Sequence, residues 1–265
     1  MSDVVRLEYR NVTMRFVERS GKSLTAVERV SLAVGDGEVV SLIGPSGCGK
    51  STLLNIGSGL CAPSEGEAFV GGERVEGPNA HVAFMLQKDL LLPWRTVLEN
   101  VMFGVEIQGL PLAERRRRAE ALLENLHLFE FSGHYPHQLS GGMRQRVALA
   151  RTLAIDPSVL LLDEPFSAVD AQTRMVLQRE LAQTLNREGK TALLITHDLL
   201  EAVTLSDRVL VMSRRPGRII DEIRIALPRR DDPIARRQEP GVNDYVGRLM
   251  DRLDIGHLEV AGASA

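Results

Sequence analysis

GPSGCGKST, residues 44–52, is the stretch that decides the fold. It fits the pattern G-x-x-x-x-G-K-[S/T], follows the apolar segment GEVVSLIG and precedes STLLNIGSGL, which has helical character. Glycines let the backbone curl so that successive N–H groups point at phosphate oxygens in front of a helix N-terminus. An ordinary glycine turn is the alternative, but the strand–loop–helix setting argues against it. The stretch predicts a phosphate-binding loop (P-loop) for a nucleotide.

Each residue type in this loop has a chemical use. Lys50 is expected to neutralise the outer phosphates, and the Ser51 hydroxyl to take one Mg²⁺ position. The predicted nucleotide contacts are Gly44, Pro45, Ser46, Gly47, Cys48, Gly49, Lys50, Ser51 and Thr52.

A second group of candidates lies in SVLLLDEP, residues 158–165. Four apolar residues, 159–162, form a buried strand that delivers Asp163 and Glu164 at its carboxyl end, where parallel sheets present ligands. Asp163 is expected to hold Mg²⁺ through water, and Glu164 to act as the general base toward the attacking water. A surface acidic turn is the alternative, and the apolar run before the carboxylates argues against it.

Two polar residues follow other predicted strands. Gln87 ends HVAFML and is a candidate Mg²⁺ ligand, while His197 ends TALLIT and is a candidate donor to the γ-phosphate. Either residue alone is more typical of an ordinary strand end. Their position after buried strands of a phosphate-binding α/β body favours function.

Composition narrows the classes of protein. With 265 residues, the chain can form one large domain, or a core with a small appended one. The formal net charge of −3 provides no global basic field, so no nucleic-acid partner is expected. The run RRRR at 115–118 is more typical of a solvated helix face than of a polyanion site.

The cysteines and the apolar segments indicate the cellular compartment in which the protein is expected. Cys48 and Cys61 are the two cysteines, and Cys48 lies in the glycine-rich loop, so we expect a reducing compartment rather than a disulfide framework. MSDVVRLEYR has no signal-peptide character, and no apolar run approaches the ~18 residues of a spanning helix. We expect a chain that is neither exported by that route nor inserted in a bilayer.

Strand and helix patterns alternate along the chain. This alternation indicates a mostly parallel sheet with covered faces. The predicted strands are 7–16, 26–34, 37–44, 67–75, 81–86, 158–165, 191–198, 207–213 and 218–227, and the predicted helices are 51–60, 96–108, 111–128, 141–155 and 170–189. From 228 a charged, proline-bounded linker leads to an amphipathic segment with Val242, Val246, Leu249 and Leu253 on one side.

LSGGMRQR, residues 139–146, adds a second apparent phosphate seat to the same chain. The chain resembles the nucleotide-binding subunit of an ATP-binding cassette (ABC) transporter. Besides LSGGMRQR, the matching features, in chain order, are GPSGCGKST, Gln87, SVLLLDEP, SAVD at 167–170 and His197. The resemblance covers nearly all of the chain up to about residue 225, and LSGGMRQR discriminates it from other P-loop ATPases.

This resemblance implies an α/β P-loop NTPase fold with a mixed β-sheet core, an antiparallel β subdomain and a helical subdomain. The implied bounds are 1–227 for the ATP-binding domain, with its helical subdomain at about 88–155, and 228–265 for the linker and C-terminal helical segment. The implied cofactors are ATP and Mg²⁺. The chemical activity is that of an ATPase, in which hydrolysis is coupled to translocation.

In the family, the signature stretch serves the nucleotide of a second subunit. Two copies meet head to tail, so that Ser140, Gly141, Gly142 and Gln145 of one copy close over the phosphate held by Lys50 of the other. Asp170 is assigned to the dimer seam. Phe16 is a candidate for stacking on adenine, with a core aromatic of the first sheet as the equal alternative.

Further similarity, at 91–101, 135–154, 163–174 and 214–219, is to bacterial importers of nitrate, sulfonates and taurine. It implies transmembrane permease subunits docking at the helical insert, a periplasmic or surface solute-binding protein, and a peripheral location on the cytoplasmic face of the inner membrane. Arg95, Leu86 and Val169 depart from the usual residues, which leaves the docking surface and the cargo open.

Three other readings compete with an importer's ATPase. A soluble ABC-type ATPase acting on nucleic acid or the ribosome would normally carry coiled-coil inserts or two cassettes. A P-loop kinase or GTPase leaves LSGGMRQR unexplained. A regulatory nucleotide-binding protein without turnover would not need Glu164, Gln87 and His197 together.

Overall fold

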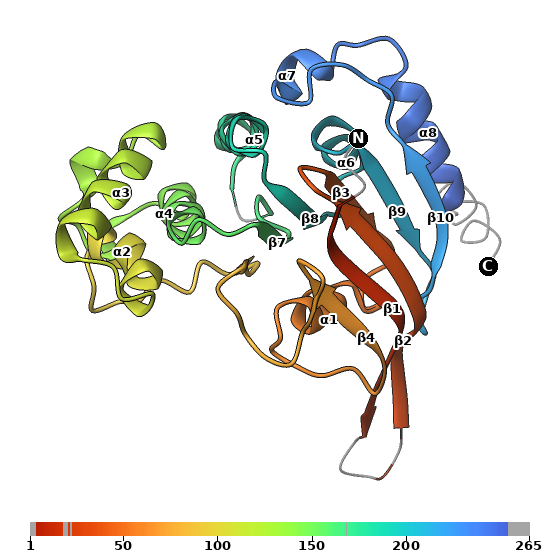
Figure 1. The fold of residues 1–265 in the computed structure, drawn as a ribbon. Helices are drawn as coiled ribbons and strands as arrows, with labels where there is room; N and C mark the ends of the chain where they lie inside the picture. Colours follow the sequence, from red (N-terminus) through yellow and green to blue (C-terminus); the bar gives the residue numbers. More distant parts are fainter. Residues whose placement is uncertain (1–3, 18–20, 22, 168, 254–265) are drawn as a thin grey trace, which may run out of the picture.

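The computed structural model describes residues 4–17, 21, 23–167 and 169–253. It contains two sheets, with one helix packed between them and the other helices beside and over the larger sheet (Figure 1). The six-stranded sheet has the order β10-β9-β3-β8-β7-β6, and the four-stranded sheet the order β2-β1-β4-β5. These two sheets confirm the predicted mixed core and antiparallel part.

The larger sheet pairs β6, β7, β8, β3 and β9 in parallel and adds β10 antiparallel at its edge. Its strands are short and apolar because both faces are covered. In β7, Leu160 and Leu162 pack in one hydrophobic cluster with the flanking helices, whereas Val159 and Leu161 pack in another. The bounds are β3 Val39–Ile43, β6 Val82–Met85, β7 Val159–Asp163, β8 Thr191–Ile195, β9 Arg208–Met212 and β10 Ile219–Arg224.

The antiparallel sheet covers α1 (Lys50–Gly57), the helix that follows the P-loop. Its strands are β1 Val5–Val17, β2 Ser23–Gly35, β4 Glu65–Val70 and β5 Glu73–Arg74. The buried Tyr9 hydroxyl donates to the Leu53 carbonyl oxygen at 2.8 Å and so fixes the sheet against α1. One predicted strand, 67–75, was wrong: Gly71 and Gly72, with φ of 60° and 85°, turn it into a hairpin.

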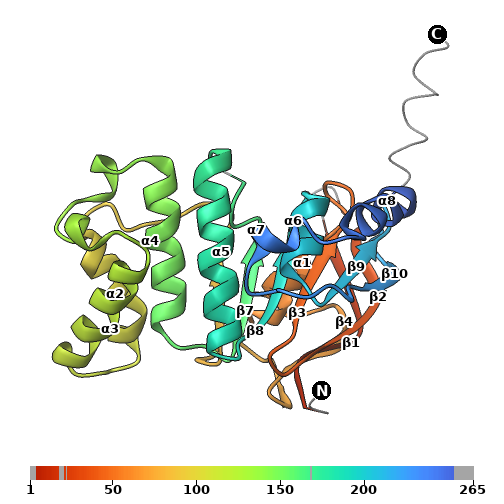
Figure 2. The same cartoon turned by 90° about the horizontal axis from the view of Figure 1, so that it is seen from above.

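A helical layer extends from the larger sheet. It contains α2 (Val97–Ile107), α3 (Leu112–Asn125) and α4 (Gly141–Ala154), with α5 (Ala171–Arg187) between α4 and the sheet (Figure 2). Thr96 and Glu99 form a capping box that starts α2.

The predicted helix 111–128 ends at Asn125, and 3₁₀ turns follow at Phe129–Phe131 and Pro136–Gln138. All four arginines of 115–118 pair with glutamates of α2 or α3, as expected of a solvated face.

The C-terminal part covers the same face of the larger sheet as α5, toward the edge formed by β9 and β10 (Figure 1). It contains α6 (Leu199–Leu205), α7 (Pro233–Arg236) and α8 (Val242–Arg252). The predicted apolar side of α8 is confirmed, since Val242 and Leu249 are buried and Val246 and Leu253 pack against the same cluster. The sequence did not predict α6 and α7, because 7 and 4 residues are too few to show a helical period. Among the described residues, no helix combines the length and the apolar character needed to cross a membrane.

Candidate nucleotide site

The P-loop joins the buried strand β3 to α1 with a backbone that needs glycine. Gly47 and Gly49 have φ of 73° and 106°, in the left-handed region. A Cβ on Gly49 would lie 2.4 Å from Cγ1 of Val27, so no other residue fits there without moving β2. The loop is therefore held against the antiparallel sheet.

Lys50 begins α1 and is 9% exposed. Its Nζ donates to the carbonyl oxygens of Gly44 at 2.7 Å and Pro45 at 3.0 Å, so the ammonium group lies across the loop. Cys48 is buried, with its Sγ 3.9 Å from the same Nζ. Cys48 thus contributes packing and backbone to the loop, and Lys50 contributes the charge.

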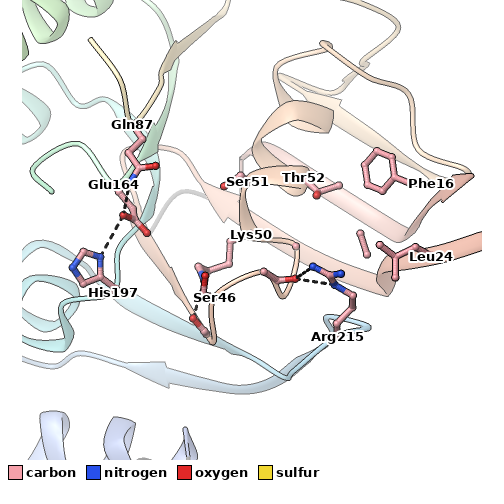
Figure 3. Close-up of a pocket in the computed structure, with 14 residues that line it drawn as sticks. Phe16, Leu24, Ser46, Lys50, Ser51, Thr52, Gln87, Glu164, His197 and Arg215 are labelled. Atoms are coloured by element: carbon pink, nitrogen blue, oxygen red, sulfur yellow. Dashed lines mark hydrogen bonds and ion pairs between the residues drawn. The ribbon is translucent and has the colours of Figure 1, made fainter. Parts of the chain in front are cut away.

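A cavity of about 560 Å³ opens over the loop. Phe16 and Leu24 lie at one end of it, and Gln87, Glu164 and His197 at the other, with Lys50 between them (Figure 3). Phe16 is 44% exposed, so it is not a core aromatic of the first sheet. The cavity is lined by Phe16, Leu24, Ala26, Gly44, Ser46, Gly47, Gly49, Lys50, Ser51, Thr52, Gln87, Glu164, His197 and Arg215.

Gln87, Glu164 and His197 converge because they follow β6, β7 and β8, which are neighbours in the parallel sheet. Gln87 Nε2 donates to Glu164 Oε2 at 3.0 Å, and His197 Nδ1 lies 3.4 Å from the same oxygen (Figure 3). Glu164 has a φ of 46°, a left-handed conformation that costs a non-glycine residue about 1–2 kcal/mol. The sheet supports this conformation through the Glu164 N–H, which donates to the Ile195 carbonyl oxygen at 3.0 Å.

Asp163 ends β7, one residue before Glu164, and is partly buried. The pKa of the Asp163 carboxyl is raised, mainly because the group is buried. The negative charge of Glu164 adds to this shift, whereas a hydrogen bond from the Ser51 hydroxyl and the positive charge of Lys50 oppose it. The carboxylate therefore lies where a cation would be favoured, since added positive charge would offset both the burial and the neighbouring carboxylate.

Ser140 and Gly141 lie elsewhere on the surface. Ser140 is the N-cap of α4, and its hydroxyl oxygen accepts from the Met143 N–H at 3.3 Å. Both residues are exposed, and in the part of the chain that the structure describes neither lines the P-loop cavity. Gly142 packs against α5, where a Cβ would lie 2.8 Å from Cγ2 of Thr173. In a single chain, the signature turn and the P-loop do not form one site.

Gln145 does not fit the role predicted for it. Its side chain is 3% exposed, and Nε2 donates to the Pro165 carbonyl oxygen at 2.6 Å within the same chain. A buried amide in this position cannot extend to a second subunit. Gln145 instead connects α4 to the turn that follows Glu164.

Asp170 is exposed and caps α5 by accepting from the N–H groups of Gln172 at 3.1 Å and Thr173 at 3.0 Å. The Thr173 backbone N–H is the main cause of its lowered pKa. Ala168, in the same SAVD stretch, lies outside the described residues. Asp170 therefore defines the start of α5.

Arg215 also lines the cavity, and the sequence did not predict it as a site residue. Its Nη2 and Nε donate to the Gly47 carbonyl oxygen at 2.6 and 2.9 Å (Figure 3). RRPGRI, at 214–219, was noticeable only as a similarity to importers. Because 168 residues separate Arg215 from Gly47, only the pairing of β9 beside β3 could reveal the contact.

Beneath His197, Glu201 is 3% exposed and accepts from Gln178 Nε2 at 2.9 Å. Burial raises the Glu201 pKa to about 7; hydrogen bonds from Thr196 and Gln178 and the charge of Arg174 oppose this shift, and Asp198 adds to it. The loop that carries His197 thus rests on a buried carboxyl group that titrates near neutral pH.

Known proteins share this fold and sequence. The sequence profile of the ABC transporter family matches residues 27–167. An uncharacterized ABC transporter ATP-binding protein of Methanocaldococcus jannaschii is 48% identical over 228 residues, 86% of this chain and 85% of that protein. A taurine import ATP-binding protein of Roseobacter denitrificans is 44% identical over 219 residues, 83% of this chain and 82% of that protein.

Among solved structures, the ATP-binding cassette MJ0796, described as a dimer in a post-hydrolysis state bound to ADP and phosphate, superposes with a TM-score of 0.75. It is 33% identical, and the match covers 83% of this chain and 98% of that one. Fold and sequence together define an ATP-hydrolysing P-loop cassette. The chain belongs to the ABC transporter family.

The Glu201 carboxyl predicts a pH-dependent stability. Because its pKa is raised in the folded chain, the native state retains a proton that the unfolded state releases above about pH 4.5. We expect this contribution to be fully present below pH 4.5 and lost as the pH rises to about 7, a decrease of about 3 kcal/mol in the free energy of unfolding.

Urea unfolding of the wild type and of Glu201→Gln, at several pH values from 4.5 to 8, measures this difference. The substitution can also change the free energy of unfolding by an amount that does not depend on pH. This constant does not affect the test, because only the slopes of the free energy of unfolding against pH are compared. Parallel curves for the two proteins would show that folding does not raise the pKa of Glu201.

Proposed function

We propose that the chain is the ATPase subunit of a membrane importer and works as a head-to-tail dimer on transmembrane permease subunits at the cytoplasmic face of the inner membrane. The main support for a dimer is the separation of two groups of residues. Gln87, Glu164 and His197 converge on the P-loop cavity. Ser140 and Gly141 are exposed and lie away from that cavity. Each copy therefore offers a phosphate cradle and a separate, unmatched signature turn.

A second copy, rotated head to tail, supplies the missing surface. The N-terminus of α4 has Ser140 as its cap and two glycines behind it, so that backbone N–H groups and the positive helix end can approach a phosphate closely. Asp170, the N-cap of α5 six residues after Glu164, would lie at the seam. The structure of the similar cassette MJ0796 with ADP and phosphate is a dimer, which supports the assembly of two copies.

Glu164 is the proposed general base for hydrolysis. Gln87 and His197 both contact Oε2, so among the described residues Oε1 is left to accept the proton of the attacking water. Lys50 and the P-loop N–H groups hold the β- and γ-phosphates in line with that water. His197, with a side chain 65% exposed, can turn to donate to the γ-phosphate, and Phe16 can stack on adenine.

The residues around the phosphates fit Mg²⁺. The Ser51 hydroxyl, the Asp163 carboxylate and the Gln87 amide oxygen are hard donors of the kind Mg²⁺ prefers, and they would hold the ion together with the phosphates and water. When bound, Mg²⁺ neutralises charge that develops on the phosphate oxygens. Glu164 orients the Gln87 amide: Gln87 Nε2 donates to the Glu164 carboxylate, which leaves the Gln87 amide oxygen for the ion.

A groove of about 760 Å³ beside the site is the proposed seat of a permease helix. It runs from Gln87 to Gly141, so an inserted helix would touch both the residue that holds Glu164 and the signature turn. Leu90, 54% exposed, lines this groove, and Trp94, 71% exposed, follows four residues later in the chain, so both offer apolar contact. Arg95 is bound to α2 through Glu106 at 2.7 Å and lies 4.9 Å from the Phe103 ring, which explains the charge at that position.

The proposed cargo is a small anion such as taurine, another sulfonate or nitrate, delivered by a solute-binding protein outside the membrane. The relatives from Roseobacter denitrificans and Jannaschia, 44% and 45% identical, are named as taurine import ATP-binding proteins. This subunit would drive the import without contacting the anion.

Glu164→Gln is expected to bind ATP and lower turnover by at least ~100-fold, because the base is lost while the shape remains. The variant should also accumulate as a dimer in size-exclusion chromatography with ATP and as a monomer without it. Lys50→Ala is the matched control, since it should form no ATP-dependent dimer. A Glu164→Gln protein that stays monomeric and hydrolyses ATP at the wild-type rate would refute both roles.

Mixed dimers test which chain supplies the signature turn. With Ser140→Arg and Lys50→Ala on the same chain, each composite site contains one lesion, and we expect almost no ATPase activity. With the substitutions on different chains, one site contains both lesions and the other contains neither, so we expect about half of the wild-type ATPase rate if the two sites act independently. Site-resolved nucleotide trapping gives a second readout: Ser140→Arg should block closure over the nucleotide on the opposite chain's Lys50. Higher activity from the same-chain arrangement, or a block confined to the substituted chain, would contradict the shared site.

The import role is tested in cells that lack the gene for this chain. We expect uptake of radiolabelled taurine, an alkanesulfonate or nitrate to be lost, restored by a wild-type copy and not restored by Glu164→Gln. Normal uptake of all three anions would reject this cargo class, and failure of the tagged chain to co-purify with a permease would reject the importer.

A further inference from the structure

The segment after β10 is tied to the core by a buried arginine. Arg236 of α7 is 1% exposed, and its guanidinium donates to the carbonyl oxygens of Thr204 at 3.2 Å, Ser206 at 3.0 Å and Leu227 at 2.9 Å. Two of these carbonyls lie at the C-terminal end of α6, where a positive charge is favoured. Because α6 begins immediately after Asp198, this arginine fixes the helix that follows His197.

The neighbouring Arg237 begins a chain of polar contacts toward the site. Its Nη2 donates to Gln178 Oε1 at 2.8 Å, and Gln178 Nε2 donates to Glu201 Oε2 at 2.9 Å. The amide orientation is dictated by chemistry, since a guanidinium can only donate and must face the amide oxygen. Gln178 and Glu201 are 1% and 3% exposed, so water cannot easily replace either contact.

The chain of contacts ends at the backbone around His197. Thr196, 2% exposed, hydrogen-bonds to Glu201, and its Oγ1 accepts from the Asp198 N–H at 3.0 Å. Thr196 and Asp198 flank His197 on both sides. From α5, Arg174 adds a contact of 3.8 Å to the Asp198 carboxylate. The position of the largely exposed His197 ring therefore depends on this buried framework.

We propose that Arg237, acting through Gln178 and Glu201, is a positioning residue for His197, so that ATP turnover depends on the charged segment after β10. The inference rests on the proposed function, in which His197 contacts the γ-phosphate. The alternative is a purely packing role for α7. Packing alone would not require a continuous donor-to-acceptor path from the guanidinium to the two residues that flank His197.

The test compares steady-state ATP hydrolysis by the full chain with Arg237→Ala and Arg237→Lys. We expect Arg237→Ala to lower kcat roughly tenfold, the equivalent of one lost charged hydrogen bond, with the ATP dissociation constant unchanged, because the P-loop is untouched. Arg237→Lys, which keeps a donor, should recover most of the rate. Arg229→Ala is the matched control, because Arg229 pairs with Glu239 inside the same segment and should leave kcat unchanged.

A double-variant cycle with Gln178→Met separates positioning from stability. Arg237→Ala should add nothing to the loss caused by Gln178→Met if both act along one path, and the thermal midpoint should not follow kcat. Multiplicative losses, or a kcat for Arg237→Ala equal to that of Arg229→Ala, would overturn the inference. His197→Ala distinguishes the two claims: its normal turnover would overturn the proposed role of His197, whereas slow His197→Ala with fast Arg237→Ala would overturn only the positioning role.

Discussion

Parallel pairing of β6, β7, β8 and β3 is the constraint on which the nucleotide site depends. It places the carboxyl ends of four buried strands at one edge, so that Gln87, Glu164, His197 and the P-loop meet. Residues paired in these strands, such as Val39 and Ala192, are 153 positions apart in the chain. Burial on both faces keeps these strands fixed in register. The left-handed Glu164 is tolerated because β8 accepts its N–H.

The same arrangement leaves the site incomplete. Lys50 lies across its own loop, where its positive charge can bind a triphosphate. The Ser140 turn, whose N–H groups could close over that triphosphate, lies on a different surface of the same chain. A dimer that forms only around ATP would convert nucleotide binding into motion, and hydrolysis would remove the contact that closed it. The proposed permease groove touches both faces and could read that change.

Much of this was predictable from local sequence, and the remainder required tertiary contacts. The P-loop, Asp163 and Glu164 follow from glycines and carboxylates placed after apolar strands, and the strands and long helices follow from their periods. Gln145 was misassigned because its burial under Pro165 has no local signal. Arg215 and Arg237 were missed because their partners, Gly47 and Gln178, are distant in sequence. The apolar pattern of 67–75 continues on both sides of Gly71 and Gly72, so it predicts one strand where the chain forms a hairpin.

The most direct measurement is a crystal structure of the Glu164→Gln protein grown with ATP and Mg²⁺. We expect two copies, head to tail, with the Ser140 hydroxyl and the Gly142 N–H of one copy within hydrogen-bond distance of the γ-phosphate held by Lys50 of the other. An ATP-bound structure in which each Ser140 turn faces solvent, away from the neighbour's nucleotide, would contradict it.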